Sequence, residues 1–269
     1  MERKINRLAI CYTMFLIMLF LSGALSGIIS ELVYFLGFLL PLFYGLYSLK
    51  DEKTPIGKYL SLDSCGAKFT LPLVFPTVAL VMLVSVLTSL LIKALTGVEN
   101  RVDVGNSVIP ALFLHALLPA ILEEALFRYL PMRMLAAHSK RVTVLLSAAL
   151  FALIHHNLFS IPYAFLAGVI FMAIDLACDS VVPSVLLHFI NNALSVGMLV
   201  FADNPAFAPT VIILTAVLSV ISVAFIVFNR KKYQEKLVFA LSVGEKYQIT
   251  LPVAALGAIC LIIAVVSIL

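Results

Sequence analysis

The feature that most constrains this sequence is its succession of long apolar runs. Several runs reach the roughly 20 residues that a helix needs to cross the hydrocarbon core of a membrane. None alternates apolar and polar residues as barrel strands do. The composition agrees, because 63% of the 269 residues are hydrophobic and 12% are charged, whereas soluble domains carry roughly 25% charged residues. The sequence therefore predicts an all-α fold, a polytopic transmembrane helical bundle.

Hydropathy predicts about nine spans. We expect them at residues 8–29, 32–49, 70–95, 107–134, 142–158, 161–178, 181–201, 209–229 and 250–269. The fifth and sixth spans are near the lower length limit and are joined by the tight turn NLFSIP, so eight spans is the alternative. No linker, low-complexity tract or internal repeat divides the chain, which predicts a single membrane domain.

The basic residues gather on one predicted side of the membrane. With a cytoplasmic N-terminus, the inner segments and inner span ends hold 15 of the 18 Lys and Arg residues, in agreement with the positive-inside rule. The net charge of +4 then follows from loops that face anionic lipid, and it indicates no nucleic-acid partner. The inner segment NRKKYQEKLVFALSVGEKYQ is expected either as an amphipathic surface helix or as a solvated loop.

Two further patterns bear on processing and redox chemistry. The N-terminal segment has a basic start, but its apolar core exceeds the roughly 7 to 15 residues of a signal peptide, which favours an uncleaved first span. The four cysteines, Cys11, Cys65, Cys178 and Cys260, are far apart and form no CxxC motif. We expect them to be small buried hydrophobes, with neither a disulfide framework nor a zinc finger.

Charged residues interrupt the fourth apolar run in the stretch ILEEALFRYL, residues 121–130. An unpaired ion at the bilayer centre costs roughly 2.5 to 3.5 kcal/mol. Glu124 and Arg128 are four residues apart on one helix face and can neutralise each other, and a packing role is the favoured interpretation of this pair. Glu123 has no such neighbour, so its partner is expected from another helix or from water.

Other buried polar residues lie at compatible depths. A rise of 1.5 Å per residue places Glu123 at roughly 16 Å, His155 at roughly 20 Å and His188 at roughly 11 Å from the inner ends of their spans. Asn192 shares a helix face with His188. These four residues are predicted to form one site, with interhelical hydrogen bonds as the alternative. His156 is assigned a supporting or interfacial part. Three further residues are expected as a neighbour of the site, an interfacial acid and a loop residue, respectively: His115, Asp175 and His138.

The stretches EEALFR, FALIH and HFINN resemble the EExxxR, FxxxH and HxxxN motifs of the CPBP family, the CAAX proteases and bacteriocin-processing proteins, also called Abi. Each motif alone is weak, but three in order across residues 123–192 of a polytopic chain are specific. The resemblance implies an intramembrane endopeptidase. Its catalytic core would comprise residues 107–201, with peripheral spans in residues 1–100 and 202–269.

The resemblance also implies roles for the site residues. Glu123 and His155 would activate a water molecule, His188 and Asn192 would stabilise the oxyanion, and Glu124 with Arg128 would support them. A carboxylate or imidazole base and a neutral donor suit peptide hydrolysis in a low-dielectric site. The sequence contains no GxSxG, HExxH or intramembrane Asp pair, so serine, zincin and presenilin-like mechanisms have little support.

Metal dependence stays open in the sequence. Glu123, His155 and His188 could form a two-His, one-carboxylate zinc site with an open position for water. We favour a reaction without an obligatory metal, because Asn192 is a good oxyanion donor and a poor zinc ligand.

Two other functional classes remain. A proton-coupled transporter should show broken helices in corresponding halves of the chain. A noncatalytic immunity or scaffold protein should tolerate substitution of Glu123 and His188. Members of the resembled family act on prenylated CAAX proteins or are linked to peptide maturation, bacteriocin immunity and lysostaphin resistance. The resemblance thus implies a membrane-embedded or lipidated protein or peptide substrate, and we expect a multi-pass protein of a bacterial plasma membrane.

Overall fold

The computed structural model describes residues 2–50, 55–61, 65–99, 104–105, 107–136, 139–155 and 157–242. Every regular element in these residues is a helix, so the all-α prediction is confirmed for them. Among the described residues, seven helices are long and apolar enough to cross a membrane: Arg3–Gly23, Gly27–Ser48, Ala67–Thr96, Val108–Met134, Ile161–Cys178, Val182–Val200 and Phe207–Phe228. The last expected span, 250–269, lies outside the described residues.

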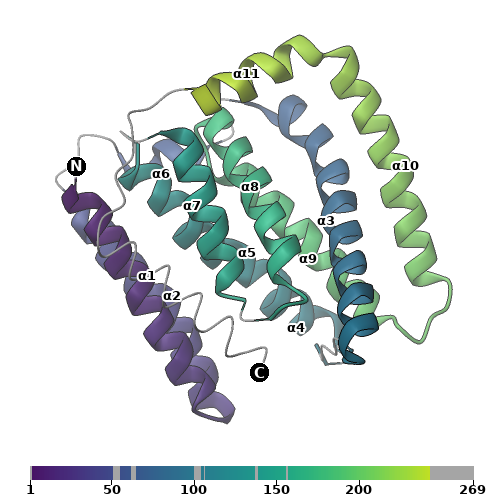
Figure 1. The fold of residues 1–269 in the computed structure, drawn as a ribbon, viewed down its shortest axis with the longest axis horizontal. Coiled ribbons are helices and arrows are strands. Elements are labelled where there is room, and N and C mark those ends of the chain that lie inside the picture. The colour runs from purple at the N-terminus through teal and green to yellow at the C-terminus, as the bar shows by residue number, and fades with distance from the viewer. Residues whose placement is uncertain are drawn as a thin grey trace.

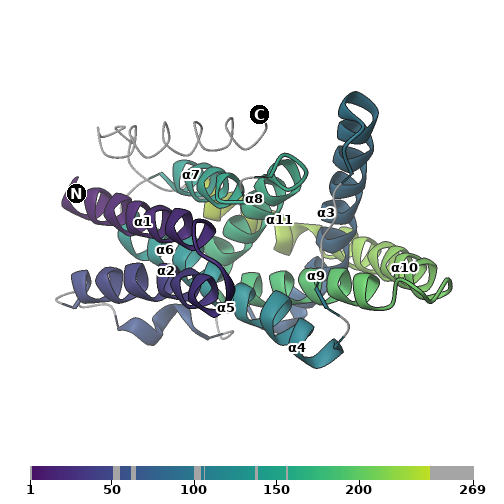
Figure 2. The same ribbon diagram turned by 90° about the horizontal axis from the view of Figure 1, so that it is seen from below.

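The helices form one bundle with a paired N-terminal edge (Figures 1 and 2). The first half of the chain contains α1 (Glu2–Gly23), α2 (Gly27–Ser48), the 3-10 turn η1 (Ile56–Tyr59) and α3 (Ala67–Thr96). The central span consists of α4 (Val108–Leu112), η2 (Phe113–Leu117), α5 (Leu118–Glu124), η3 (Ala125–Tyr129) and α6 (Leu130–Met134), of which η2 and η3 are π turns. The chain continues with α7 (Lys140–Leu153), α8 (Ile161–Cys178), α9 (Val182–Val200), α10 (Phe207–Phe228) and α11 (Arg230–Ser242).

The expected fifth span, 142–158, is wrong as a full-length crossing. The helix α7 has 14 residues, a length of about 21 Å, whereas the hydrocarbon core is about 30 Å thick. The chain turns before α8 because Asn157 accepts hydrogen bonds there, through its side chain from the Phe159 N–H and through its carbonyl from the Ser160 N–H. The α7–α8 hairpin is therefore short.

Two close contacts hold this bundle together. Tyr12 and Phe15 of α1 pack on Phe127 of η3, with ring centroids 5.3 and 5.7 Å apart. A Cβ atom added at Gly168 of α8 would lie 2.8 Å from the Cα atom of Ala148 of α7. Only glycine permits so close an approach of these two helices, so Gly168 sets the packing of the α7–α8 hairpin.

Several basic residues lie at one end of the bundle. Arg7 donates to the Ser48 carbonyl at 2.6 Å, which joins the start of α1 to the end of α2. Lys58 pairs with Asp179 at 3.2 Å, next to the end of α8, and this contact raises the pKa of the Lys58 ammonium group. The start of α1, the end of α2, η1 and the end of α8 thus share this end, shown uppermost in Figure 1. Below it is called the basic end.

The segment after α10 forms the helix α11. The sequence had left a surface helix and a solvated loop as the two alternatives. Tyr233 of α11 stacks on Phe69 of α3 with ring centroids 4.7 Å apart, and its hydroxyl donates to the Phe69 carbonyl at 3.2 Å. The helix α11 therefore packs against the basic end of the bundle through its buried tyrosine.

The cysteine expectation is wrong for one pair. Cys65 and Cys178 form a disulfide across 113 residues of sequence, joining the segment before α3 to the end of α8. Spacing along the chain gives no hint of a pair that tertiary folding brings together. Cys11 is free and buried, as predicted, and Cys260 lies outside the described residues.

Candidate active site

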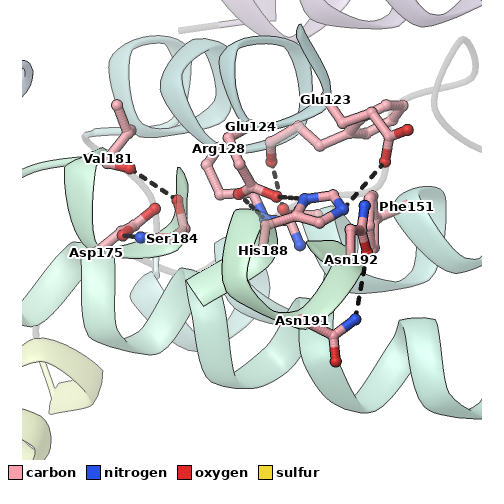
Figure 3. Close-up of polar contacts among 12 residues, drawn as sticks. Glu123, Glu124, Arg128, Phe151, Asp175, Val181, Ser184, His188, Asn191 and Asn192 are labelled. Carbon is pink, nitrogen blue, oxygen red and sulfur yellow. Dashed lines mark hydrogen bonds and ion pairs between the residues drawn. The ribbon is translucent and has the colours of Figure 1, made fainter. Parts of the chain in front are cut away.

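Two neighbouring carboxylates of α5 hold one imidazole of α9 (Figure 3). The Nδ1 atom of His188 lies 2.7 Å from Oε1 of Glu124. The Nε2 atom of the same ring lies 3.9 Å from Oε2 of Glu123. The Glu123 carboxylate thus faces His188 of another helix, but its Oε2 atom makes no hydrogen bond within the described part of the chain, so the expected partner, another helix or water, stays a prediction. The His188 and Glu123 side chains are buried but keep 7% and 11% exposure, whereas Glu124 has none.

Local helix geometry explains this arrangement. Adjacent residues on a helix point about 100° apart, so Glu123 and Glu124 can flank one ring that approaches from a facing helix. The π turn η3 begins at the next residue, Ala125. Such π turns inside α-helices are frequent at functional sites, and this one carries Arg128.

Arg128 fixes the charge of Glu124. Its Nε atom lies 3.1 Å from Oε2 of Glu124, with both side chains fully buried, so the predicted pair is confirmed. The guanidinium group also lies 4.0 Å from the ring centroid of Phe151 and 5.5 Å from that of Phe171, where cation–π attraction stabilises it. A carboxylate paired in this way can only accept hydrogen bonds, so Nδ1 of His188 carries a proton and donates it.

His155 follows the end of α7, in the turn of the short hairpin. Its Nδ1 atom lies 2.8 Å from the carbonyl oxygen of Phe151, the residue four positions earlier. A carbonyl only accepts, so Nδ1 of His155 donates as well. The Phe151 ring lies 5.0 Å from the His155 ring and 5.8 Å from the His188 ring. Phe151 therefore packs against both imidazole rings and the Arg128 guanidinium group.

Asn192 completes the predicted set on α9. Its side-chain oxygen accepts a hydrogen bond from the amide of Asn191 at 3.3 Å. Figure 3 shows its amide nitrogen pointing toward Glu123 and His188. The amide of Asn192 is thus available as a donor to a molecule bound at these residues.

All four predicted catalytic residues line one cavity of about 480 Å³. Its walls come from α3, η2, α5, α7, α8 and α9, and include Val81, Met82, Ser85, Val86, His115, Tyr163, Phe171, Asn191, Ser195, Met198 and Leu199. Sequence reasoning missed Asn191 and Ser195, although their spacing of three and seven residues from His188 puts them on its helix face. It also missed α3, whose apolar residues carry no such signal.

A model of the family described as type II CAAX prenyl endopeptidase Rce1-like matches residues 105–194, which contain all of these motif residues. This segment is thus similar to the Rce1-like family. The family is one of peptide hydrolases. The Rce1-like segment spans most of the predicted core, 107–201, whose limits stay a prediction. Neither the curated proteins nor the solved structures that were compared gave a match.

Behind His188 the Rce1-like segment contains a buried acid. Asp175 of α8 is fully buried in the bundle, three residues before the end of that helix, and its expected position at the membrane interface stays a prediction. Its Oδ1 atom accepts a hydrogen bond of 3.0 Å from the backbone N–H of Ser184, in the first turn of α9. A carboxylate satisfies the free N–H groups of a helix N-terminus, so Asp175 anchors the start of the helix that carries His188. His138 and His156 lie outside the described residues.

The Rce1-like site contains the histidine and carboxylate side chains that zinc sites use, but these side chains do not surround one point. Both imidazoles donate through Nδ1, as metal-binding histidines do. However, no three His, Cys, Asp or Glu side chains within the described part of the chain lie close enough together to hold a metal ion. Glu123, His155 and His188 as arranged here thus do not form a ligand set, and no step proposed below passes through a metal.

Proposed function

We propose that this chain is an intramembrane endopeptidase that hydrolyses a peptide bond in a membrane-associated protein or peptide. The observation that carries the proposal is His188 held between Glu123 and Glu124 at the base of a cavity. Polar contacts whose only role is to hold helices together need no such cavity. Similarity of residues 105–194 to a peptide hydrolase family agrees with it. From the short basic loops we infer a bacterial plasma membrane as the compartment.

The charges of the cluster leave one proton to be shared. Glu123 and Glu124 as carboxylates and Arg128 as a cation sum to −1 in a buried site, and burial favours neutral clusters. A proton on either Glu123 or Nε2 of His188 brings the sum to zero. These two atoms are 3.9 Å apart, so a water molecule or a substrate oxygen can bridge them.

The reaction follows from that proton and from the side chains that line the cavity. Glu123, together with Nε2 of His155, takes a proton from water as the water oxygen attacks the peptide carbonyl carbon. The carbonyl oxygen gains the electron pair and is stabilised by the Nε2–H of His188 and the amide of Asn192. When the tetrahedral intermediate collapses, the C–N bond breaks and the proton passes to the leaving amine. Glu124 and Arg128 hold His188 in the required orientation.

The test compares two isosteric substitutions. Glu123→Gln removes the base from the cavity, whereas Glu235→Gln makes the same change at an exposed position of α11. Mass-spectrometric peptide profiles of cells that carry each variant should show loss of specific products for Glu123→Gln alone, with both proteins accumulating to wild-type levels. Unchanged products in the Glu123→Gln cells would contradict the proposal and favour a noncatalytic role.

A further inference from the structure

The amide of Asn192 can face the catalytic cluster in two orientations. A side-chain amide has an NH2 donor on one side and an acceptor oxygen on the other, and the two orientations have almost the same shape. In Figure 3 Asn192 presents its nitrogen to Glu123 and His188. The opposite orientation would present its oxygen to the same space. The NH2 group stabilises a developing oxyanion, whereas the amide oxygen repels it, so the orientation decides whether Asn192 can assist the reaction.

The reacting groups do not fix this orientation by themselves. In the proposed reaction Nε2 of His188 carries a proton, and a donor attracts the oxygen of a neighbouring amide rather than its NH2 group. Glu123 has the opposite effect while it is a carboxylate, but it loses that charge once it has taken a proton from water. The orientation of Asn192 therefore needs a partner outside the reacting groups.

Asn191 supplies such a partner. Its Nδ2 atom donates to Oδ1 of Asn192 at 3.3 Å, and Figure 3 shows Asn192 between Asn191 and Glu123. Both asparagines follow His188 on α9 and line the cavity. Ser195, one turn further along α9, donates its only hydroxyl proton to the Asn191 backbone carbonyl at 2.9 Å, so it does not donate that proton to Asn192. The Asn191 amide is thus the group that holds the Asn192 oxygen.

The strength of this hydrogen bond sets the size of the effect. A neutral hydrogen bond favours the orientation that makes it by about 2- to 13-fold. A carboxylate in place of the Asn191 amide could only accept, so it would bind the NH2 group of Asn192 and turn the oxygen toward the cavity. A hydrogen bond to a charged group favours its orientation by about 13- to 150-fold. An apolar side chain of similar size would favour neither orientation.

We propose that Asn191 is a positioning residue, which holds the Asn192 amide with its NH2 group toward the peptide carbonyl that is hydrolysed. Asn191 acts through Asn192, whose NH2 group contacts the developing oxyanion. This inference rests on the proposed endopeptidase function, because the orientation of Asn192 matters for the rate only where an oxyanion forms beside it.

Two substitutions of Asn191 separate orientation from packing. Asn191→Asp keeps the shape of the side chain and reverses the hydrogen bond, whereas Asn191→Leu removes it. In purified, reconstituted protein, kcat should fall by about 10- to 150-fold for Asn191→Asp and by at most about 2-fold for Asn191→Leu. KM should stay nearly constant, because the oxyanion forms only in the transition state. A packing role predicts that Asn191→Leu is the more harmful change, and that order, or wild-type kcat in Asn191→Asp, would overturn the proposal.

A double-mutant cycle controls for the charge that Asn191→Asp adds. Asn192→Leu alone should lower kcat by about 100- to 1,000-fold, as loss of one oxyanion donor does. In this background no amide remains to be turned, so Asn191→Asp should lower kcat by less than a further factor of about 2. A direct effect of the added charge on Glu123 would persist in full, and that result would overturn the proposal.

Glu123→Gln in the same series separates this inference from the proposed function. If Glu123→Gln is inactive and Asn191→Asp is as active as the wild type, the endopeptidase function stands and the role of Asn191 is refuted. If Glu123→Gln forms product at the wild-type rate, the endopeptidase function is refuted, and the role of Asn191 is refuted with it.

Discussion

Replacement of Glu124 by Gln tests how the cluster is held together. The substitution keeps the shape of the side chain and an oxygen that can accept from Nδ1 of His188, but it removes the negative charge. A hydrogen bond to a charged group contributes about 1.5 to 3 kcal/mol, and the bond to His188 is 2.7 Å long. The neutral bond that Gln retains contributes about 0.5 to 1.5 kcal/mol, so a loss of about 1 to 1.5 kcal/mol in the transition state should lower hydrolysis by about 5- to 13-fold.

The same change leaves the Arg128 guanidinium buried without its carboxylate partner. Breaking one half of a buried pair costs about 3 to 5 kcal/mol of stability, so the thermal unfolding temperature of Glu124→Gln should also fall. The double variant Glu124→Gln/Arg128→Met removes the unpaired charge and should regain most of the stability. It should regain no activity, because His188 still lacks its anion.

Purified, reconstituted protein allows both quantities to be measured on one sample. Unfolding is followed by thermal denaturation, and hydrolysis by the rate of product formation from a peptide identified in the cellular profiles. Wild-type activity in Glu124→Gln, or recovery of activity in the double variant, would refute the role of Glu124 as the anion that orients His188.

Three further predictions concern packing, the disulfide and metal. Gly168→Ala should lower the free energy of unfolding by about 1 to 3 kcal/mol, because the added methyl group meets the Ala148 backbone. Gly57→Ala, where an added Cβ has no heavy atom within 4 Å, should change it by less than about 0.5 kcal/mol; equal effects in denaturation would contradict the close approach of α7 and α8. Reductant should destabilise the wild-type chain by about 2 to 4 kcal/mol but should leave the unfolding of a Cys65→Ser/Cys178→Ser variant unchanged, and equal sensitivity of both would argue against the bond. Hydrolysis should survive strict chelation, and chelator-sensitive activity that zinc restores would reverse the preference for a metal-independent reaction.

The parts of the structure that sequence predicted correctly depend on local chemistry. The length of the apolar runs alone was sufficient to predict the seven long helices of the described residues. The spacing of Glu124 and Arg128 was sufficient for their ion pair, because both residues share one helix face. The high cost of a buried charge led to the expectation of a partner for Glu123 from another helix or from water, and His188 is the side chain that faces it, at 3.9 Å.

The parts that failed depend on contacts between distant segments. Hydropathy could not show that α7 ends at Leu153, since apolar residues continue into the turn that Asn157 stabilises. The contact of Asp175 was missed because its partner, the N–H of Ser184, is a backbone group that no motif marks. The wall that α3 contributes to the cavity consists mainly of residues that are equally suited to face lipid.

The central claim is that Glu123 activates a water molecule for attack on a peptide bond. Hydrolysis in isotopically labelled water tests it most directly, because the new carboxyl terminus acquires one oxygen atom from the solvent. The wild-type protein should produce a labelled carboxyl terminus, and Glu123→Gln should produce none while Glu235→Gln behaves as wild type. Labelled product at the wild-type rate from Glu123→Gln would contradict the account.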